Sequence, residues 1–253
     1  MIDLITSPEV WAAFLALVTM EIILGIDNLI FISIIIDKLP QESRAFARRI
    51  GIGLALILRL GLLSIISWIV SLTVPVFDLG IMGTMTEHGE PSFETAFSVR
   101  DLILIAGGLF LVWKSTTEIQ QAVQPTPADS VFKSKPSAGL TKVIIQIILL
   151  DLVFSFDSIL TAVGMTNHLP IMYAAVIIAV FVMFVASGPV ASFIHDNPTI
   201  IMLALAFLLM IGMVLIADGF GRHIPKGYIY AAMAFSAFVE GLNMVARKRA
   251  ARI

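Results

Sequence analysis

The chain has 253 residues, of which 58% are hydrophobic and only 13% charged, whereas ordinary soluble domains are about 25% charged. With a mean hydropathy of +0.99, this composition excludes a soluble globular fold and predicts an integral membrane protein. The net charge of −2 gives no reason to expect a nucleic-acid partner, and the lack of cysteine excludes disulfides and thiolate metal sites.

Seven apolar runs are long enough, at about 20 residues each, to cross a bilayer as helices. In chain order they fall at Val10–Ile36, Ile50–Ser71, Leu102–Ile119, Val143–Met165, Ile171–Ile194, Thr199–Ala217 and Tyr228–Val245. The first run lacks a basic n-region and a small-residue cleavage site, so we expect a retained helix and not a signal peptide. The predicted fold class is all-α, a polytopic membrane protein with seven transmembrane helices in contact with the lipid bilayer.

Basic residues predict how these helices are oriented. The first loop, the third loop and the C-terminal tail, which lie on one side of a seven-helix chain, are rich in lysine and arginine. Their basic residues are Lys38, Arg44, Arg48, Arg49, Lys114, Lys133, Lys135, Lys142, Arg247, Lys248, Arg249 and Arg252. The opposite side carries only Arg100, Arg222 and Lys226. The positive-inside rule therefore predicts an outside N-terminus and a cytoplasmic C-terminus in a bacterial cytoplasmic (inner) membrane.

Two long connections divide the chain. Phe77–Val99, expected outside, is acidic and is predicted to be either a solvated loop or a surface that attracts cations. Gln124–Gly139 contains three prolines, which is typical of a linker. We therefore predict a first repeat at 1–123, a cytoplasmic linker at 124–139, a second repeat at 140–219, and a seventh helix with a basic tail at 220–253.

The first and fourth predicted helices share a motif of an acid, five residues, an aspartate and a small polar residue. The two copies, 130 residues apart, are Glu21, Asp27 and Asn28, and Asp151, Asp157 and Ser158. Because three helices separate the copies, the first and fourth helices cross the membrane in opposite directions. We predict a 3+3 inverted repeat plus one C-terminal helix, an arrangement that in transporters places the substrate near the membrane midplane.

Helix geometry predicts two layers of carboxylates in this repeat. At a rise of about 1.5 Å per residue, Glu21 falls level with Asp157, and Asp27 falls level with Asp151. On a continuous helix Glu21 and Asp27 point about 120° apart. We therefore consider Gly25 a candidate bend that re-aims Asp27.

Ionisable side chains inside a membrane are costly, at about 2.5–3.5 kcal/mol or more each, and they favour a functional site. The candidate metal ligands are Glu21, Asp27, Asn28, Asp151, Asp157, Ser158, Glu240 and Asn243. Arg59 is a candidate counter-ion, either structural or a tethered cation that fills the site when metal leaves. Two alternatives stay open: protonated acids that only hold helices together, and a mere anchoring role for Glu240 and Asn243.

The ligand chemistry favours a hard or borderline divalent ion. Carboxylate, amide and hydroxyl oxygens suit manganese, magnesium or calcium. All four histidines fall in loops or at helix ends, and zinc and copper usually recruit histidine or cysteine. We expect no bound cofactor and a transported Mn²⁺ or another divalent cation, with metal release by proton uptake as a further hypothesis.

Three segments resemble the signatures of the TerC family of bacterial integral membrane proteins. They are Glu21–Ile32 (EIILGIDNLIFI), Asp151–Met165 (DLVFSFDSILTAVGM) and Pro225–Met244 (PKGYIYAAMAFSAFVEGLNM). The resemblance covers nearly the whole chain and is closest to the short branch without CBS domains. It implies a seven-span fold related to the LysE transporter superfamily and manganese export as the activity. It also places the family's acidic motifs on the two repeat copies and on Glu240 and Asn243.

Other functional classes remain as alternatives. An accessory membrane protein of a metal or tellurite stress-resistance system would act through partners, but a scaffold needs no matched buried acids. An intramembrane aspartyl protease would need a Gly-x-Gly-Asp motif, which Gly25–Asp27 only approximates. We find no phosphate-cradling glycine-rich loop, so nucleotide coupling within the chain is not expected. We predict a transporter and not an enzyme, of open oligomeric state.

Overall fold

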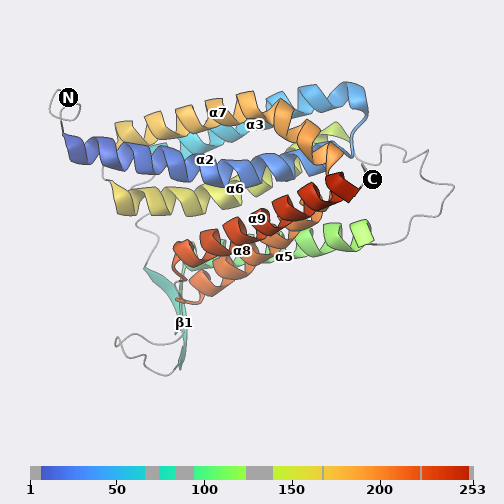
Figure 1. Ribbon diagram of the computed structural model, residues 1–253. Helices are drawn as coiled ribbons and strands as arrows, with labels where there is room; N and C mark the ends of the chain where they lie inside the picture. The colour runs from blue at the N-terminus through green and yellow to red at the C-terminus, as the bar shows by residue number, and fades with distance from the viewer. Residues whose placement is uncertain are drawn as a thin grey trace. The chain divides into compact units, whose positions relative to one another are not determined.

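The structure is a computed structural model that describes residues 7–65, 74–83, 94–123, 139–166, 168–222 and 224–250 (Figure 1). Nearly all of these residues are helical, which confirms the predicted all-α membrane class. The helices are α2 (Pro8–Ile36), α3 (Gln41–Ser64), α5 (Val99–Val123), α6 (Leu140–Met165), α7 (Leu169–Asp196), α8 (Pro198–Gly219) and α9 (Lys226–Ala250). Two strands, β1 (Pro75–Met82) and β2 (Glu94–Ser98), complete the described elements.

Six of the described helices are long and apolar enough to cross a membrane, namely all except α3. The predicted second span, Ile50–Ser71, coincides with the apolar part of α3 and continues past its described end. The described part of α3 also contains Arg48, Arg49 and Arg59, which lower its mean hydropathy. Seven crossings therefore stay a prediction, although six follow from the length and composition of the helices.

The helices form two compact units, each described here by itself. The first unit contains α2, α3, α6 and α7, and the second contains α5, α8, α9 and the two strands. Each unit therefore draws helices from both halves of the sequence, so the compact units do not follow the predicted repeat boundaries. The repeats and their inversion stay predictions.

Within the first unit, α2 packs against α7, and α3 packs against α6. The ring of Phe31 on α2 stacks on that of Phe154 on α6, with centroids 6.2 Å apart. Gly51 allows α3 to approach Ile147 of α6, because an added Cβ would lie 3.1 Å from that side chain. In each of these contacts the first helix of one sequence half (α2 or α6) packs against the second helix of the other half (α7 or α3). Such reciprocal packing is expected of two related halves.

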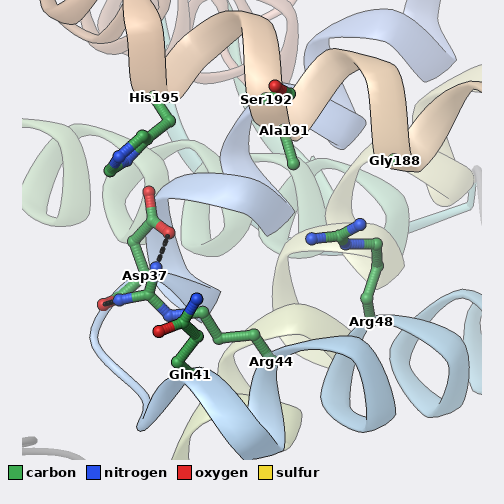
Figure 2. A pocket seen from close by; sticks show the side chains of 8 residues that line it. All are labelled: Asp37, Gln41, Arg44, Arg48, Gly188, Ala191, Ser192 and His195. Atoms are coloured by element: carbon green, nitrogen blue, oxygen red, sulfur yellow. Dashed lines mark hydrogen bonds and ion pairs between the residues drawn. The ribbon is translucent and has the colours of Figure 1, made fainter.

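The turn between α2 and α3 is held by Arg44 (Figure 2). Its Nη1 donates to the carboxylate of Asp37 at 2.9 Å, and its other nitrogens donate to the carbonyls of Asp37 (2.7 Å) and Leu39 (3.0 Å). At the same end of the unit, α7 contains Pro189 in its interior. Proline lacks a backbone N–H and disturbs the helix, which accounts for the bend of α7 in Figure 1.

The second unit depends on close contact between α5 and α8. Gly108 lies so near α8 that an added Cβ would be 2.5 Å from the carbonyl oxygen of Gly212. Small residues permit such backbone approach between membrane helices. By contrast, only 11% of the candidate span Lys226–Arg247 in α9 is buried in the structure. Most of α9 is therefore available for contact with lipid.

The predicted acidic loop at Phe77–Val99 is partly wrong, because strands β1 and β2 pair there as an antiparallel hairpin. The hydroxyl of Thr95 accepts from Ile81 N at 3.0 Å and donates to Ile81 O at 2.9 Å. The carboxylate of Asp78 accepts from Gly80 N at 2.8 Å and so supports the local turn. The intervening acids Glu87 and Glu90 lie outside the described residues, and the attraction of cations stays a prediction.

Candidate functional site

Arg59 occupies the centre of the first unit. It lies on the buried face of α3, one turn from Ala55 and Leu63, and its exposed fraction is 2%. The apolar residues around it on α3 offer nothing that compensates a guanidinium charge. A buried charge of this kind is tolerated only when partners of opposite charge surround it.

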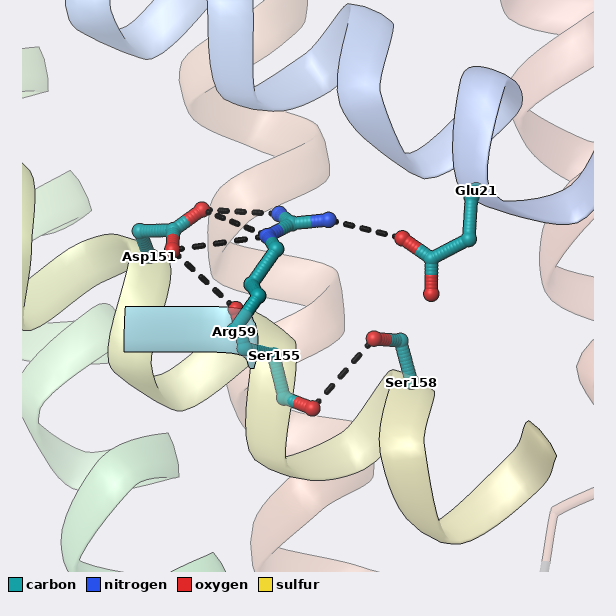
Figure 3. Close-up of polar contacts among 5 residues, drawn as sticks. All are labelled: Glu21, Arg59, Asp151, Ser155 and Ser158. Carbon is teal, nitrogen blue, oxygen red and sulfur yellow. Dashed lines mark hydrogen bonds and ion pairs between the residues drawn. The ribbon is translucent and has the colours of Figure 1, made fainter. Parts of the chain in front are cut away.

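Two carboxylates provide that compensation, one from each copy of the repeated motif (Figure 3). Nη1 of Arg59 donates to Oε2 of Glu21 on α2 at 2.7 Å. Nη2 donates to Oδ1 of Asp151 on α6 at 2.7 Å, and Nε donates to the same oxygen at 3.2 Å. The predicted counter-ion therefore joins the first acid of each motif, and with both acids ionised the three groups carry a net charge of −1.

Serine hydroxyls extend the cluster along α6. Ser155 Oγ donates to Oδ2 of Asp151 at 3.1 Å, and Ser158 Oγ donates to the Ser155 carbonyl at 3.3 Å. Ser158, a predicted ligand, is seven residues from Asp151 and so shares its helix face. Both serines are fully buried, which makes this face of α6 a polar stripe inside an apolar unit.

Asn28, two turns from Glu21 on α2, is a buried polar side chain without a hydrogen-bond partner in the described part of the chain. Its exposed fraction is 4%, and neither its amide oxygen nor its amide nitrogen has a hydrogen-bond partner among the described residues. An unsatisfied buried amide costs about 1–3 kcal/mol, so its retention calls for a reason other than stability. A ligand that binds the amide oxygen would provide that reason.

Met183 of α7 lies between Glu21 and Asn28 on the face that α2 turns inward. The positions of Glu21, Gly25 and Asn28 align on this face, since they are four and three residues apart. A Cβ added to Gly25 would lie 2.5 Å from the sulfur of Met183. The predicted bend at Gly25 is not seen as a break in α2, which is helical throughout Pro8–Ile36; the glycine instead admits the thioether.

A small cavity of about 10 Å³ adjoins Glu21. Its remaining lining is apolar and includes Leu17, Ile159 and Val176. This volume holds about one water molecule at most.

The structure says less about the second acid of each motif, Asp27 and Asp157. Asp27 lies within α2, but its side chain falls outside the described residues. Asp157 is half-buried on α6, and its backbone carbonyl accepts from Thr161 Oγ1 at 3.0 Å. The predicted pairing of these two acids into layers with Glu21 and Asp151 therefore stays a prediction.

Glu240 and Asn243 lie on α9 in the second unit, whereas the cluster around Arg59 belongs to the first. Glu240 accepts from Arg247 at 2.6 Å and from the hydroxyl of Thr199. Asn243 Nδ2 donates to Glu240 at 3.5 Å and is exposed. Glu240 therefore has a counter-ion of its own, and a place for these two residues in one ligand set remains a prediction.

Sequence reasoning misplaced one charge. Lys114 was assigned to the third loop, but it lies within α5, is 7% exposed, and donates to Glu118 at 2.7 Å. The helical spacing of four residues between a lysine and a glutamate is the signal for this pair. Because the charges of Lys114 and Glu118 compensate each other, both side chains can be buried on α5.

Among the described residues, no three histidine, aspartate or glutamate side chains gather closely enough to hold a metal ion. The physical reason lies in the site itself, since Arg59 stands between Glu21 and Asp151 and binds both. In this conformation Glu21, Arg59 and Asp151 form a buried ionic cluster.

These features define a helical integral membrane protein with an ionic cluster shared by two related helices. The chain belongs to the Integral membrane protein TerC family, whose family model matches residues 6–252. It is 45% identical to the UPF0053 inner membrane protein YgdQ of Escherichia coli, over 97% of both chains. It is also 49% identical to the UPF0053 inner membrane protein YoaE of Escherichia coli, over 97% of this chain but only 45% of that protein.

The UPF0053 protein YegH of Escherichia coli is a further relative, 46% identical over 96% of this chain and 43% of its own length. The chain thus spans slightly less than half of YoaE and YegH, and nearly all of YgdQ. No solved structure matches the chain.

Proposed function

We propose that this protein transports a divalent metal cation, with manganese as its substrate and export from the cytoplasm as its direction. The observation that carries the proposal is the pair of buried carboxylates, Glu21 and Asp151, which two related helices direct at the same point. A structural role would need only one acid for one arginine. Here Arg59 binds two acids, and α2 also carries the buried amide of Asn28, unpartnered among the described residues.

The donor set is composed of oxygen. The proposed donors are the carboxylates of Glu21 and Asp151, the amide oxygen of Asn28 and the hydroxyl of Ser158. Oxygen donors of this kind suit manganese, magnesium and calcium. Manganese is proposed because of the family resemblance, and the thioether of Met183 near Gly25 adds a softer atom that favours manganese over the two harder ions.

In the proposed cycle Arg59 is a tethered cation that competes with the substrate. A divalent ion brings two positive charges to the carboxylates where the guanidinium brings one. When the ion enters, Arg59 leaves at least one carboxylate, and when the ion departs, Arg59 returns and keeps the acids neutralised. Protons that bind the carboxylates would favour release, which supports exchange of metal for protons.

The orientation follows from the lysines and arginines, with the C-terminus in the cytoplasm. The export direction comes from the family resemblance alone, because buried carboxylates serve uptake equally well. The two motif-bearing helices, α2 and α6, lie in one unit, as expected for a substrate site at the junction of inverted repeats.

The test is manganese flux into liposomes that contain the purified protein and a manganese-sensitive dye. Wild type should give flux that responds to an imposed pH gradient, whereas Glu21→Gln and Asp151→Asn should lower the rate at least tenfold. Glu42→Gln is the matched control, because Glu42 begins α3 in the same unit but is exposed. Wild-type liposomes without flux of manganese, magnesium or calcium would contradict transport and favour an accessory protein that acts through partners.

A further inference from the structure

A polar furrow runs between the first turns of α3 and the last turns of α7, apart from the buried cluster (Figure 2). Its outer part has a volume of about 540 Å³. This part is lined by Asp37, Gln41, Arg44, Arg48, Gly188, Ala191, Ser192 and His195. The residues on each helix recur at helical spacing, so two complete helix faces form the walls.

A second hollow of about 320 Å³ continues the furrow along the same two helices. Arg48 and Gly188 line both hollows and so mark their junction. Beyond the junction the wall is contributed by Phe184 and Val185, which are 46% and 61% exposed, together with Ala45, Arg49 and Ser187. The second hollow therefore adds exposed apolar side chains to the furrow, beside a second arginine.

Arg48 is the side chain in the furrow with unused donors. Its Nε is buried without a hydrogen-bond partner, and within the described part of the chain it has no ion pair. In Figure 2 its guanidinium extends into the space between α3 and α7. A buried guanidinium N–H without an acceptor is costly and indicates a missing acceptor of negative charge.

The other charges of the furrow leave it positive. Asp37 is neutralised by Arg44, each of whose three nitrogens donates to the turn. Arg48 and Arg49 then contribute two uncompensated charges, while Gln41, Ser192 and His195 offer neutral donors. The furrow is thus unsuited to a cation in transit and suited to an anion.

We propose that the furrow binds one anionic phospholipid, with its phosphate on Arg48 and its acyl chains over Phe184 and Val185. The hollow lined by Gln41, Arg44 and Ser192 suits the headgroup of the lipid. The exposed side chains of Phe184 and Val185 suit the part of the acyl chains nearest the glycerol. Residues 184–195 of α7 cover about 16 Å at 1.5 Å per residue, enough for a headgroup and the first methylenes. Basic pockets between membrane helices bind anionic headgroups in this way.

A soluble phosphate compound would use the same contacts on Arg48 but would leave Phe184 and Val185 uncovered. The exposed Phe184 and Val185 therefore favour a lipid as the occupant. This inference does not depend on transport, since none of these residues belongs to the proposed ion site.

The experiment is native mass spectrometry of the purified full chain with added phosphatidylglycerol or phosphatidylcholine. Wild type should retain phosphatidylglycerol in preference to phosphatidylcholine, and Arg48→Gln should weaken that binding about fivefold. Lys142→Gln is the matched control, because it removes one exposed positive charge at the start of α6 in the same unit. It should leave binding unchanged.

A second variant separates loss of charge from loss of fold. Gly188→Leu keeps Arg48 but fills the junction, where an added Cβ would lie 4.0 Å from Arg48 Nη1. It should also weaken binding of phosphatidylglycerol. The proposal is overturned if Arg48→Gln and Gly188→Leu both bind phosphatidylglycerol as wild type does. It is also overturned if inorganic phosphate alone displaces phosphatidylglycerol and raises the melting temperature of the protein as much as the lipid does.

Discussion

Replacing Arg59 with methionine would remove the positive charge from the centre of the first unit and keep much of the side-chain volume. Two carboxylates, Glu21 and Asp151, would then face each other without a counter-ion, each less than 5% exposed. The variant would also lose three short donor contacts of 2.7, 2.7 and 3.2 Å.

Removal of one partner from a buried ion pair typically costs about 3–5 kcal/mol. Arg59 serves two carboxylates, so we expect a loss at the upper end of that range in the free energy of unfolding. The control is Arg49→Met on the same helix, where the side chain is exposed. That change should cost less than about 1 kcal/mol.

The assay is equilibrium unfolding in mixed micelles, with helical content followed as the fraction of denaturing detergent rises. A triple variant with Arg59→Met, Glu21→Met and Asp151→Leu should regain most of the loss, because an apolar replacement of a whole ionic cluster is often neutral or stabilising. The reasoning fails if Arg59→Met alone unfolds like wild type, or if the triple variant is less stable than the single one.

Three further predictions concern other parts of the molecule. Gly108→Ala should lower the melting temperature, because its Cβ would meet a backbone carbonyl of α8 at 2.5 Å, whereas Gly61→Ala, with nothing within 4 Å, should not lower it. Asn28→Leu should raise the free energy of unfolding by about 1–3 kcal/mol, because an unsatisfied buried amide is removed. The same variant should abolish manganese flux in liposomes, and unchanged flux would exclude the amide as a ligand. Lys114→Met should lower the free energy of unfolding by about 3–5 kcal/mol, because Glu118 loses its buried partner, and adding Glu118→Gln should restore part of it in a double-mutant cycle.

The positions of the helices were predictable from apolar runs because the membrane leaves helices as the simplest way to pair every backbone group. The burial of Arg59 was also predictable, since it lies in the middle of such a run. Its two partners were not, because helical periodicity gives the face of a side chain but not which neighbouring helix covers it. The contact of α3 with both α2 and α6 supplies that information.

Sequence reasoning missed the β1–β2 hairpin and the burial of Lys114, and both depend on contacts between pairs of residues. The strands Pro75–Met82 and Glu94–Ser98 lie between apolar runs, where hydropathy carries no signal and pairing depends on contacts across the hairpin. The prediction that counts Lys114 with the third loop is wrong because this lysine lies within α5, where an unpaired charge would be costly. Its cost is offset by Glu118 one turn further on, a compensation that becomes visible only when pairs of charges are considered.

The arrangement of helices also explains why the two motif copies need each other. Glu21 and Asp151 belong to different sequence halves, yet one arginine on α3 binds both at 2.7 Å. Neither α2 nor α6 could bury its acid alone without a large free-energy cost. The ionic cluster therefore ties the two halves together within the first unit, and any ion that displaces Arg59 must take over this structural role. In the proposed transport cycle, a cation that enters the site would change how α2, α3 and α6 are held, and this would couple binding to the conformational change that alternating access requires.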